Sequence, residues 1–258
     1  MWIVTRKDLS GMAIEVFNRR EIKYSVPVEL LRDVRDRLEQ YMTLDAYCTN
    51  GTYTVSNIYF DTEDSELIRR SLSKPKYKEK VRLRAYGVPD PEDLIFLEIK
   101  KKFKGQGNKR RTRITHEEAE QFILTGKKPK MKEYMNPQVI NELKYILQGN
   151  NLSPKLYLAY DRVAYFSADT DLRITIDTNI RTRRYDLDLT MGDYGESLIS
   201  DELSIMEVKS MHSFPLWMVS ILTDFNINKI SFSKYGTEYK NLLREQLLDS
   251  RLVIAGGF

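Results

Sequence analysis

The sequence predicts an α+β protein in which about eight strands form an antiparallel sheet or a closed barrel with peripheral helices. Two observations lead to this fold class. Segments rich in β-branched and aromatic residues recur between turn signals along the 258 residues, with amphipathic helical segments between and after them. The predicted strands also gather their charged residues on one face, as expected for strands whose other face packs against a core.

The N-terminal half begins with a strand and a helix. We expect a strand over residues 14–24, a helix over 27–42 with proline in its first turn, a strand over 53–60 and a short helix over 61–72. Three charged strands follow at 77–87, 94–103 and 109–114. The turns between them lie at 87–91 and 105–107, where glycine and proline are concentrated.

The C-terminal half alternates helices and strands. Thr115-His116-Glu117-Glu118 has the pattern of a capping box and opens a helix to residue 124, and Asn136-Pro137 begins a second helix to about residue 148. Strands are expected at 155–166, 172–184 and 203–210, and helices at 215–224 and 236–249. No internal repeat or low-complexity linker interrupts this order, so we expect a single domain over residues 1–258 with its core at roughly 14–245.

Composition excludes several classes of protein. A net charge of +4 is unlike that of a strongly basic nucleic-acid-binding protein. The one cysteine, Cys48, excludes an internal disulfide and a cysteine-based zinc site. The two histidines, His116 and His212, argue against a catalytic triad or a multi-histidine metal site, and we expect them in a first helical turn and a loop. Without a long apolar run or a signal-peptide pattern, we expect a cytoplasmic protein with no transmembrane segment.

Five stretches place three or more charged residues on one face of a predicted strand, and most of these charges are positive. They are 19–23, 80–84, 98–102, 109–113 and 181–184. Alternate side chains of a strand share a face, so Lys80, Arg82 and Arg84 stand in one row at a spacing of roughly 7 Å. Aligned like charges are unfavourable unless an anion lies among them. The pattern therefore favours a polyphosphate channel over an ordinary solvated sheet face, which is the alternative.

Four acidic residues lie within strand rows that also carry basic residues: Glu21, Glu98, Asp177 and Glu207. They either form cross-strand ion pairs or, together with phosphate oxygens, hold Mg²⁺ or Mn²⁺, which prefer oxygen ligands. We take Glu207 as the preferred metal ligand and the other three as further candidates. The glycine-rich phosphate-binding motifs of nucleotide-binding proteins are missing, so side chains would have to hold any ATP.

Eight short segments, in order along the chain, resemble those of a known family. They are residues 20–24, 58–62, 80–86, 96–100, 160–162, 173–177, 206–209 and 232–235. Together they resemble the VTC domain, the polyphosphate polymerase domain of the vacuolar transporter chaperone complex and its bacterial relatives, within the triphosphate tunnel metalloenzyme superfamily. The resemblance covers roughly residues 14–245. It is to the compact bacterial form, which is without membrane-spanning or inositol-phosphate-sensing domains.

The resemblance implies an antiparallel β-barrel tunnel lined by Lys and Arg, with a glutamate-bound divalent metal, Mn²⁺ or Mg²⁺. It further implies transfer of the γ-phosphate of ATP onto a growing polyphosphate chain, with metal binding by Glu207. The matching phosphate-binding positions are Lys23, Arg82, Arg84, Lys100, Arg162, Arg173 and Lys234. The basic rows add Lys80, Lys102 and Lys209, with secondary contacts from Arg19, Arg111 and Arg113. Ser231, where the family often has a lysine, is a further secondary contact, and this departure concerns substrate affinity or processivity and not the fold.

Three other functions are alternatives. A triphosphatase on the same tunnel would release phosphate from triphosphate, thiamine triphosphate or a nucleotide. Such hydrolases more often begin with Glu-x-Glu-x-Lys, and Arg19 in the first of these positions favours the polymerase. A polyphosphate-binding module would bind without turnover, and a nucleic-acid-binding protein would need a basic exterior and aromatic platforms. We therefore expect ATP and inorganic polyphosphate as partners, no nucleic acid, and membrane contact only through another protein.

Overall fold

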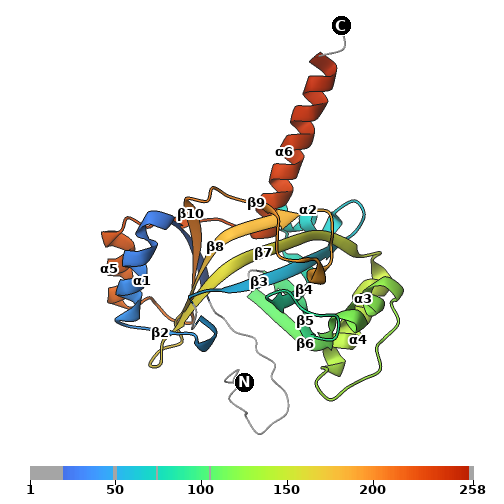
Figure 1. The fold of residues 1–258 in the computed structure, drawn as a ribbon, viewed down its shortest axis with the longest axis horizontal. Coiled ribbons are helices and arrows are strands. Elements are labelled where there is room, and N and C mark those ends of the chain that lie inside the picture. The colour runs from blue at the N-terminus through green and yellow to red at the C-terminus, as the bar shows by residue number, and fades with distance from the viewer. Residues whose placement is uncertain (1–19, 49–50, 74, 105, 256–258) are drawn as a thin grey trace.

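One strongly curved antiparallel sheet forms the centre of the molecule, with two groups of helices on its outer side and the start of a long helix beneath it (Figure 1). The structure is a computed structural model that describes residues 20–48, 51–73, 75–104 and 106–255, so Arg19 of the expected site lies outside the described residues. The combination of a large antiparallel sheet and separate helices confirms the predicted α+β class. None of the described helices is both long enough and apolar enough to span a bilayer.

The described sheet has more strands than the sequence predicts. The strands are β1 (Arg20–Pro27), β2 (Thr43–Leu44), β3 (Tyr53–Asp61), β4 (Tyr77–Tyr86), β5 (Leu94–Phe103), β6 (Gln106–Thr115), β7 (Ser153–Phe166), β8 (Arg173–Arg183), β9 (Glu196–Ser197), β10 (Leu203–Ser210) and β11 (Lys229–Ile230). The expected number was about eight. The three that were missed, β2, β9 and β11, have two residues each and are too short to produce a period-two pattern.

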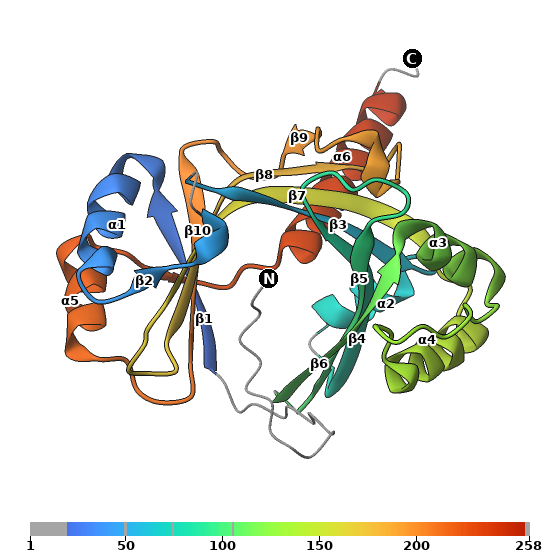
Figure 2. The same ribbon diagram turned by 60° about the horizontal axis from the view of Figure 1, so that its bottom comes forward.

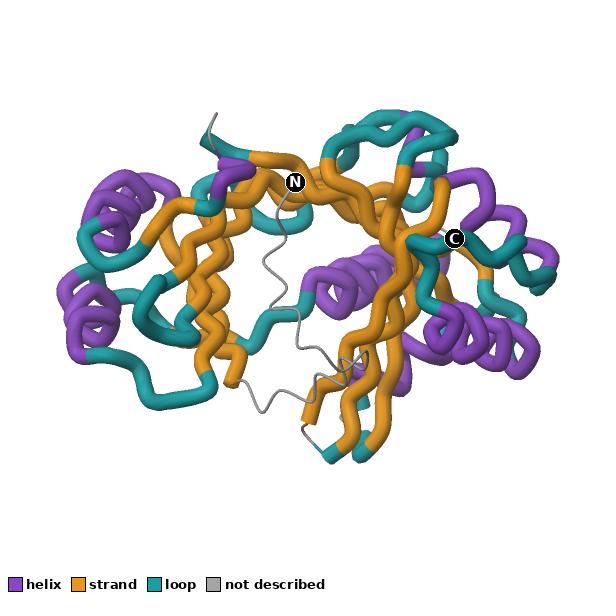
Figure 3. The backbone as a smooth tube through the Cα atoms, turned by 90° about the horizontal axis from the view of Figure 1, so that it is seen from below, coloured by secondary structure: helices purple, strands orange, loops and turns teal. Residues whose placement is uncertain are grey.

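The sheet is an open arch and not the closed barrel that the resemblance implies (Figure 3). Its strands are hydrogen-bonded in the order β11-β1-β10-β8-β7-β3-β4-β5-β6, with β2 beside β7 and β9 beside β8. Within the described part of the chain, β11 and β6 therefore form the two edges. A two-residue β11 cannot pair along the ten residues of β6, and the charged side chains of β6 also disfavour pairing at that edge.

Two groups of helices cover the outer side of the arch (Figure 2). Helices α1 (Leu31–Glu39) and α5 (Leu216–Asp224) share a core with β1, β8 and β10. Helices α3 (His116–Thr125) and α4 (Pro137–Gly149) share a second core with β4, β5 and β6. Because both cores lie on the outer side, the charged residues that alternate with the core residues point to the concave side of the arch.

The helix starts follow from their capping residues. The hydroxyl of Thr115 accepts from the amide of Glu118, whose carboxylate accepts in return from the Thr115 amide, which confirms the capping box of α3. Asn136 caps α4 as predicted. Helix α2 (Glu66–Leu72) begins later than expected, because the buried carboxylate of Asp61 accepts from amides of its first turn across the preceding turn.

The longest helix, α6 (Lys234–Ala255), begins beneath the arch and projects away from it (Figure 1). Tyr235 and Tyr239 in its first turns pack in a third apolar cluster with Leu158 and Tyr160 of β7. The sequence predicted this helix over 236–249, so the observed helix is longer than predicted at both ends. Packing of these two tyrosines fixes the start of α6 beside the concave face.

A β-bulge in β8 overturns one of the five predicted basic rows. Ala159 of β7 pairs with Arg181 and Asp161 pairs with Thr178, so two residues of β8 lie opposite one of β7. Asn179 takes the positive φ of 46° that this geometry needs. The extra residue reverses the side-chain alternation, and Arg181 and Arg183 point to the outer side instead of joining the row of Arg173.

Candidate active site

The remaining basic rows meet on the concave side. In β4, Val81 and Leu83 belong to the outer core, so Lys80, Arg82 and Arg84 face inward. The same alternation makes the predicted site residues of the neighbouring strands face inward. They are Glu21 and Lys23 of β1, Glu98, Lys100 and Lys102 of β5, Arg111 and Arg113 of β6, Arg162 of β7, Arg173 and Asp177 of β8, and Glu207 and Lys209 of β10. Lys234 reaches the same side from the start of α6.

Glu207 lies among three basic residues at one flank of this face. Its Oε2 is 3.5 Å from Nζ of Lys23, and its Oε1 pairs with Lys209. Nζ of Lys23 is also 3.6 Å from Oε1 of Glu21, so a cation sits between two carboxylates of adjacent strands. Burial alone would raise the pKa of Glu207, but Lys209, Lys23 and Lys100 outweigh it and hold that pKa well below its usual range.

Glu98 is the most enclosed acid of the opposite flank, with a side chain 1% exposed. Nη2 of Arg82 and Nζ of Lys109 each lie 2.6 Å from its carboxylate, and Nε of Arg84 lies 4.0 Å away. These three cations outweigh the burial that would raise the pKa of Glu98, and they keep it strongly below its usual range. Glu98 is therefore an ionised anchor that fixes the directions of two arginines and a lysine.

Asp177 links β7, β8 and the start of α6. Arg162 binds it in a bidentate manner, with Nε and Nη2 at 2.6 and 2.8 Å from Oδ1 and Oδ2, and Lys234 contacts Oδ2 as well. Burial raises the pKa of Asp177, but Arg162 and Lys234 outweigh it and lower that pKa to about 2. This carboxylate has its oxygens occupied by protein cations, in contrast to Glu207, whose lysine partners are partly exposed.

Side chains and one short segment connect the two ends of the open sheet. Nζ of Lys100 on β5 lies 3.8 Å from Oε2 of Glu21 on β1, although these strands are far apart in the strand order. Residues 232–234 run between the flanks: Lys23 donates to the carbonyl of Phe232 at 3.1 Å, and Lys80 donates to Ser233 Oγ at 3.3 Å. The concave face is thus enclosed by contacts between side chains and not by a closed ladder of hydrogen bonds.

The outlying candidates lie at the margins of this face. Lys102, Arg173 and Arg113 are exposed, and the guanidinium of Arg111 stacks 4.5 Å from the ring centroid of Phe96. Ser231, which directly follows β11, is exposed as well. These residues surround the concave face instead of filling it, so contact with substrate would be at its ends.

The charge on this face is not balanced by its own carboxylates. Burial lowers the pKa of Lys80 to about 8 and that of Lys109 to about 7, even though Tyr59 and Glu98 act in the opposite direction. Burial would raise the pKa of Tyr59, but Arg82, Lys80 and Arg84 lower it to about 7. Amines that lose protons and a phenol that ionises this easily are the response of a strongly positive site, which an anion would relieve.

Sequence reasoning missed several residues of this face. Lys109 was left out of the expected site, although it shares a row with Arg111 and Arg113, and that spacing was the signal that could have found it. Tyr59 and Tyr160 do not belong to the charged rows. Their hydroxyls accept hydrogen bonds from Arg82 and Arg84 respectively. Asn57 accepts from Arg84 as well. Uncharged strand residues carry no sequence signal for such a role.

Comparison with known families decides the assignment. A family model of the VTC domain matches residues 18–243, which is most of the chain. The chain belongs to the VTC domain family. The match includes all the strands and the first turns of α6, so the enclosed face described above is part of the VTC domain.

The VTC domain is similar to part of longer eukaryotic proteins. It is 27% identical over 229 residues to vacuolar transporter chaperone complex subunit 4 of Trypanosoma cruzi, covering 73% of this chain and 29% of that protein. It is 23% identical over 271 residues to the subunit of the same name in Schizosaccharomyces pombe, covering 88% of this chain and 37% of that protein. The chain therefore spans about a third of the length of these relatives.

Solved structures support the fold of the VTC domain. A protein of Bacillus halodurans described as a candidate adenylate cyclase superposes with a TM-score of 0.50 at 15% identity, covering 83% of this chain and 92% of that one. A Hippeastrum protein, described as a candidate adenylyl cyclase with dominant triphosphatase activity, gives 0.51 at 16% identity, covering 86% and 95%. At these identities the likeness concerns the fold alone.

Proposed function

We propose that this VTC domain is a polyphosphate polymerase that transfers the γ-phosphate of ATP to a growing chain of inorganic polyphosphate. One observation carries the proposal: basic rows from both flanks of the arch meet on one enclosed face that carries more positive charge than its carboxylates neutralise. A linear polyanion, with a charge at every phosphate, matches a face of this kind better than a compact anion does. The similarity to vacuolar transporter chaperone subunits supports the same substrate class.

The proposed reaction needs little covalent work from the protein. A terminal oxygen of the polyphosphate chain attacks the γ-phosphorus of ATP, the bond from that phosphorus to the β,γ-bridging oxygen breaks, and ADP leaves with that oxygen. The charges of reactants and products are equal without transfer of a proton, so no general base is required. Catalysis then depends on positioning and on neutralising charge, which Lys and Arg side chains supply.

Separate groups of residues would divide these tasks. Arg82 and Arg84, held by Glu98, and Arg162, held by Asp177, present guanidinium groups in fixed directions and suit bidentate binding of phosphate oxygens. Lys23, Lys100 and Lys209 are held more loosely around Glu207 and can follow phosphates as the chain advances. The arginines would therefore hold the triphosphate, and the lysines would bind the acceptor chain.

The residues near Glu207 also fit a divalent cation. Nζ of Lys23 already places a positive charge between Glu207 and Glu21, and these carboxylates are the oxygen donors that Mn²⁺ and Mg²⁺ accept together with phosphate oxygens. Glu207 would be the first ligand and Glu21 the second, whereas Glu98 and Asp177 are committed to arginines. Such an ion would supply charge neutralisation at the transferred phosphate.

We further propose that the chain acts as a single catalytic domain on the cytoplasmic side of a membrane, where ATP is available, and that another protein provides any membrane contact. The buried thiol of Cys48 is consistent with a reducing compartment. Detection of the protein in the cytosolic fraction and on the cytoplasmic face of membranes tests this placement. Its recovery in an oxidising compartment would contradict it.

The test of function is ³¹P NMR of the purified protein with ATP and Mn²⁺ or Mg²⁺. We expect an internal-phosphate signal to grow as ADP forms, and E207Q to reduce this rate at least a hundredfold. K101M is the matched control, because Lys101 lies on the outer face of β5, where it pairs with Glu142 at 2.7 Å. Orthophosphate as the product would indicate a triphosphatase, and binding without turnover would indicate a polyphosphate-binding module; either result overturns the proposal.

A further inference from the structure

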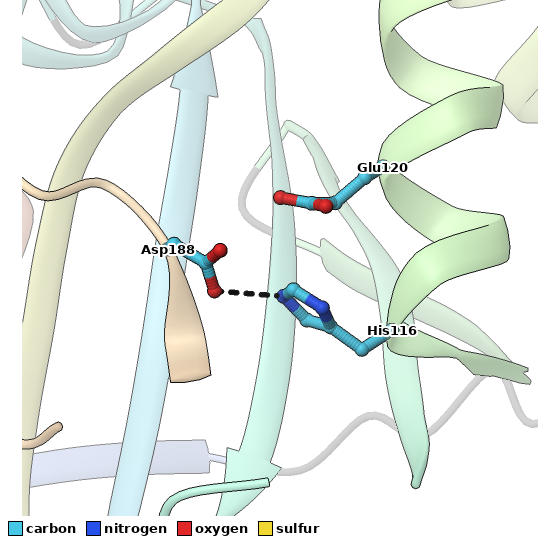
Figure 4. Close-up of side chains that lie close together, drawn as sticks. All are labelled: His116, Glu120 and Asp188. Carbon is cyan, nitrogen blue, oxygen red and sulfur yellow. Dashed lines mark ion pairs between the residues drawn. The ribbon is translucent and has the colours of Figure 1, made fainter. Parts of the chain in front are cut away.

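A second group of possible metal ligands lies on the outer side of the arch, away from the basic face. His116 and Glu120 of α3 and Asp188, just before the short helix η3 (Leu189–Met191), bring one nitrogen and two carboxylate oxygens within 4.8 Å of one another (Figure 4). Among the described residues, this is the place where three such side chains converge. Leu189 and Ala119, which are neighbours in the chain of Asp188 and Glu120, both belong to the outer core, so this cluster lies on that side of the sheet.

The imidazole of His116 is the observation that needs an explanation. The residue is 2% exposed, and its Nε2 is buried without a hydrogen-bond partner among the described residues. Oδ1 of Asp188 lies 3.2 Å away, and it forms an ion pair with this nitrogen only when the imidazole is protonated. A buried polar nitrogen without a partner is costly, and a metal ion in front of it would supply the missing interaction.

The two carboxylates face this nitrogen and are held in place. Figure 4 shows Asp188 and Glu120 on adjacent sides of the imidazole, with the Asp188 carboxylate directed toward it. Asp188 Oδ1 accepts from the amide and hydroxyl of Thr190 at 2.7 and 2.9 Å, which fixes its direction. Glu120 lies four residues after His116 on the same face of α3.

We propose that His116, Glu120 and Asp188 form a structural Zn²⁺ site that ties η3 to α3. One imidazole with two carboxylates suits Zn²⁺, which binds nitrogen at about 2.0–2.1 Å and carboxylate oxygen at about 2.0–2.2 Å. Two ligands at these lengths on a tetrahedral ion are about 3.6 Å apart at most, so the donor atoms, now within 4.8 Å of one another, would draw closer on binding. The oxygen donors near Glu207 suit Mn²⁺ or Mg²⁺ instead, so the two places differ in the metal they select.

The two histidines of this chain make the test direct. The measurement is an NMR spectrum that correlates the imidazole carbons and protons of chelator-treated protein. His116 and His212 give one set of signals each, and the set that disappears in H212Q belongs to His212. We expect Zn²⁺ to shift the His116 signals and to reach saturation at one equivalent, while those of the exposed His212 stay in place. His116 signals that do not move at several equivalents of Zn²⁺ would overturn the proposal.

Variants separate ligands from neighbours. E120Q should weaken Zn²⁺ binding at least tenfold, and D188N should do the same while keeping an N-cap side chain for η3. E117Q is the matched control, because Glu117 directly follows His116 but is exposed and outside the cluster, and this variant should bind Zn²⁺ as the unmodified protein does. Equal weakening in E117Q and E120Q would mean nonspecific binding and would refute the assignment. E207Q should leave the His116 shift unchanged, which separates this site from the proposed active site.

Discussion

Binding of tripolyphosphate should draw protons into the protein at pH 8, and Lys80 should take up a measurable share of them. Burial lowers the pKa of Lys80 to about 8, so about half of the amines are uncharged at this pH without ligand. A bound polyanion would return that pKa toward about 10.4 and make Lys80 take up roughly half a proton. Because the bound state holds more protons, affinity must fall as pH rises, by roughly thirtyfold between pH 8 and pH 10 for this group alone.

Calorimetry measures this uptake directly. Titrations in two buffers of different ionisation enthalpy, without metal and at pH 8, give the number of protons from the difference in heat. The second ionisation of a terminal phosphate, near pH 6, is already complete there, so the ligand releases few protons. Tyr59 and Lys109, with pKa values lowered to about 7, add to the uptake in the same direction.

K80M should lose about half a proton of uptake and the part of the pH dependence that belongs to Lys80, and K101M on the outer face should lose neither. Proton release on binding at pH 8 would refute the reasoning. So would an uptake that is the same in K80M and in the unmodified protein, because the uncharged fraction of Lys80 would then play no part in anion binding.

Three further predictions concern other parts of the molecule. E98Q should lower the free energy of unfolding by about 3–5 kcal/mol in urea titrations, because it leaves Arg82 and Lys109 without a buried anion; a loss below about 1 kcal/mol would contradict the role of Glu98 as an anchor. T115A should cost about 1 kcal/mol by the same measurement through loss of the α3 cap, and no change would contradict the capping box. R183M should leave tripolyphosphate affinity within twofold, because the bulge turns Arg183 outward, whereas R82M should weaken it at least tenfold. Equal losses of affinity in the two variants would mean that Arg82 and Arg183 share one face, which would contradict the bulge.

The sequence was sufficient for those parts of the fold that depend on local chemistry. Thr115 and Asn136 start α3 and α4 because capping is decided within four residues. The inward rows of β4, β5 and β10 follow from alternation, which needs no information about neighbouring strands. These features account for the predicted class and for nearly all the residues on the concave face.

The errors have a different origin. Whether the sheet closes depends on strand pairing between distant segments, and β11 is too short to reveal its place at one edge. The bulge at Asn179 is a backbone feature of one residue, and the charges after it continue the same spacing in the sequence. His116 was taken as an ordinary residue of a first helical turn, because Asp188 approaches it from 72 positions further along the chain.

The bulge in β8 also decides how this strand can change through insertion and deletion. Asn179 and Ile180 both lie opposite Tyr160, so deletion of Asn179 would remove the bulge and leave Ile180 in its apolar cluster and Arg181 and Arg183 on the outer side. Deletion of Thr182, with the bulge kept, would instead move Arg183 to the concave side and end its stacking 3.5 Å from the ring centroid of Tyr157. Strand β8 therefore has one position at which it can lose a residue and keep both faces, whereas a loss only three residues later exchanges them.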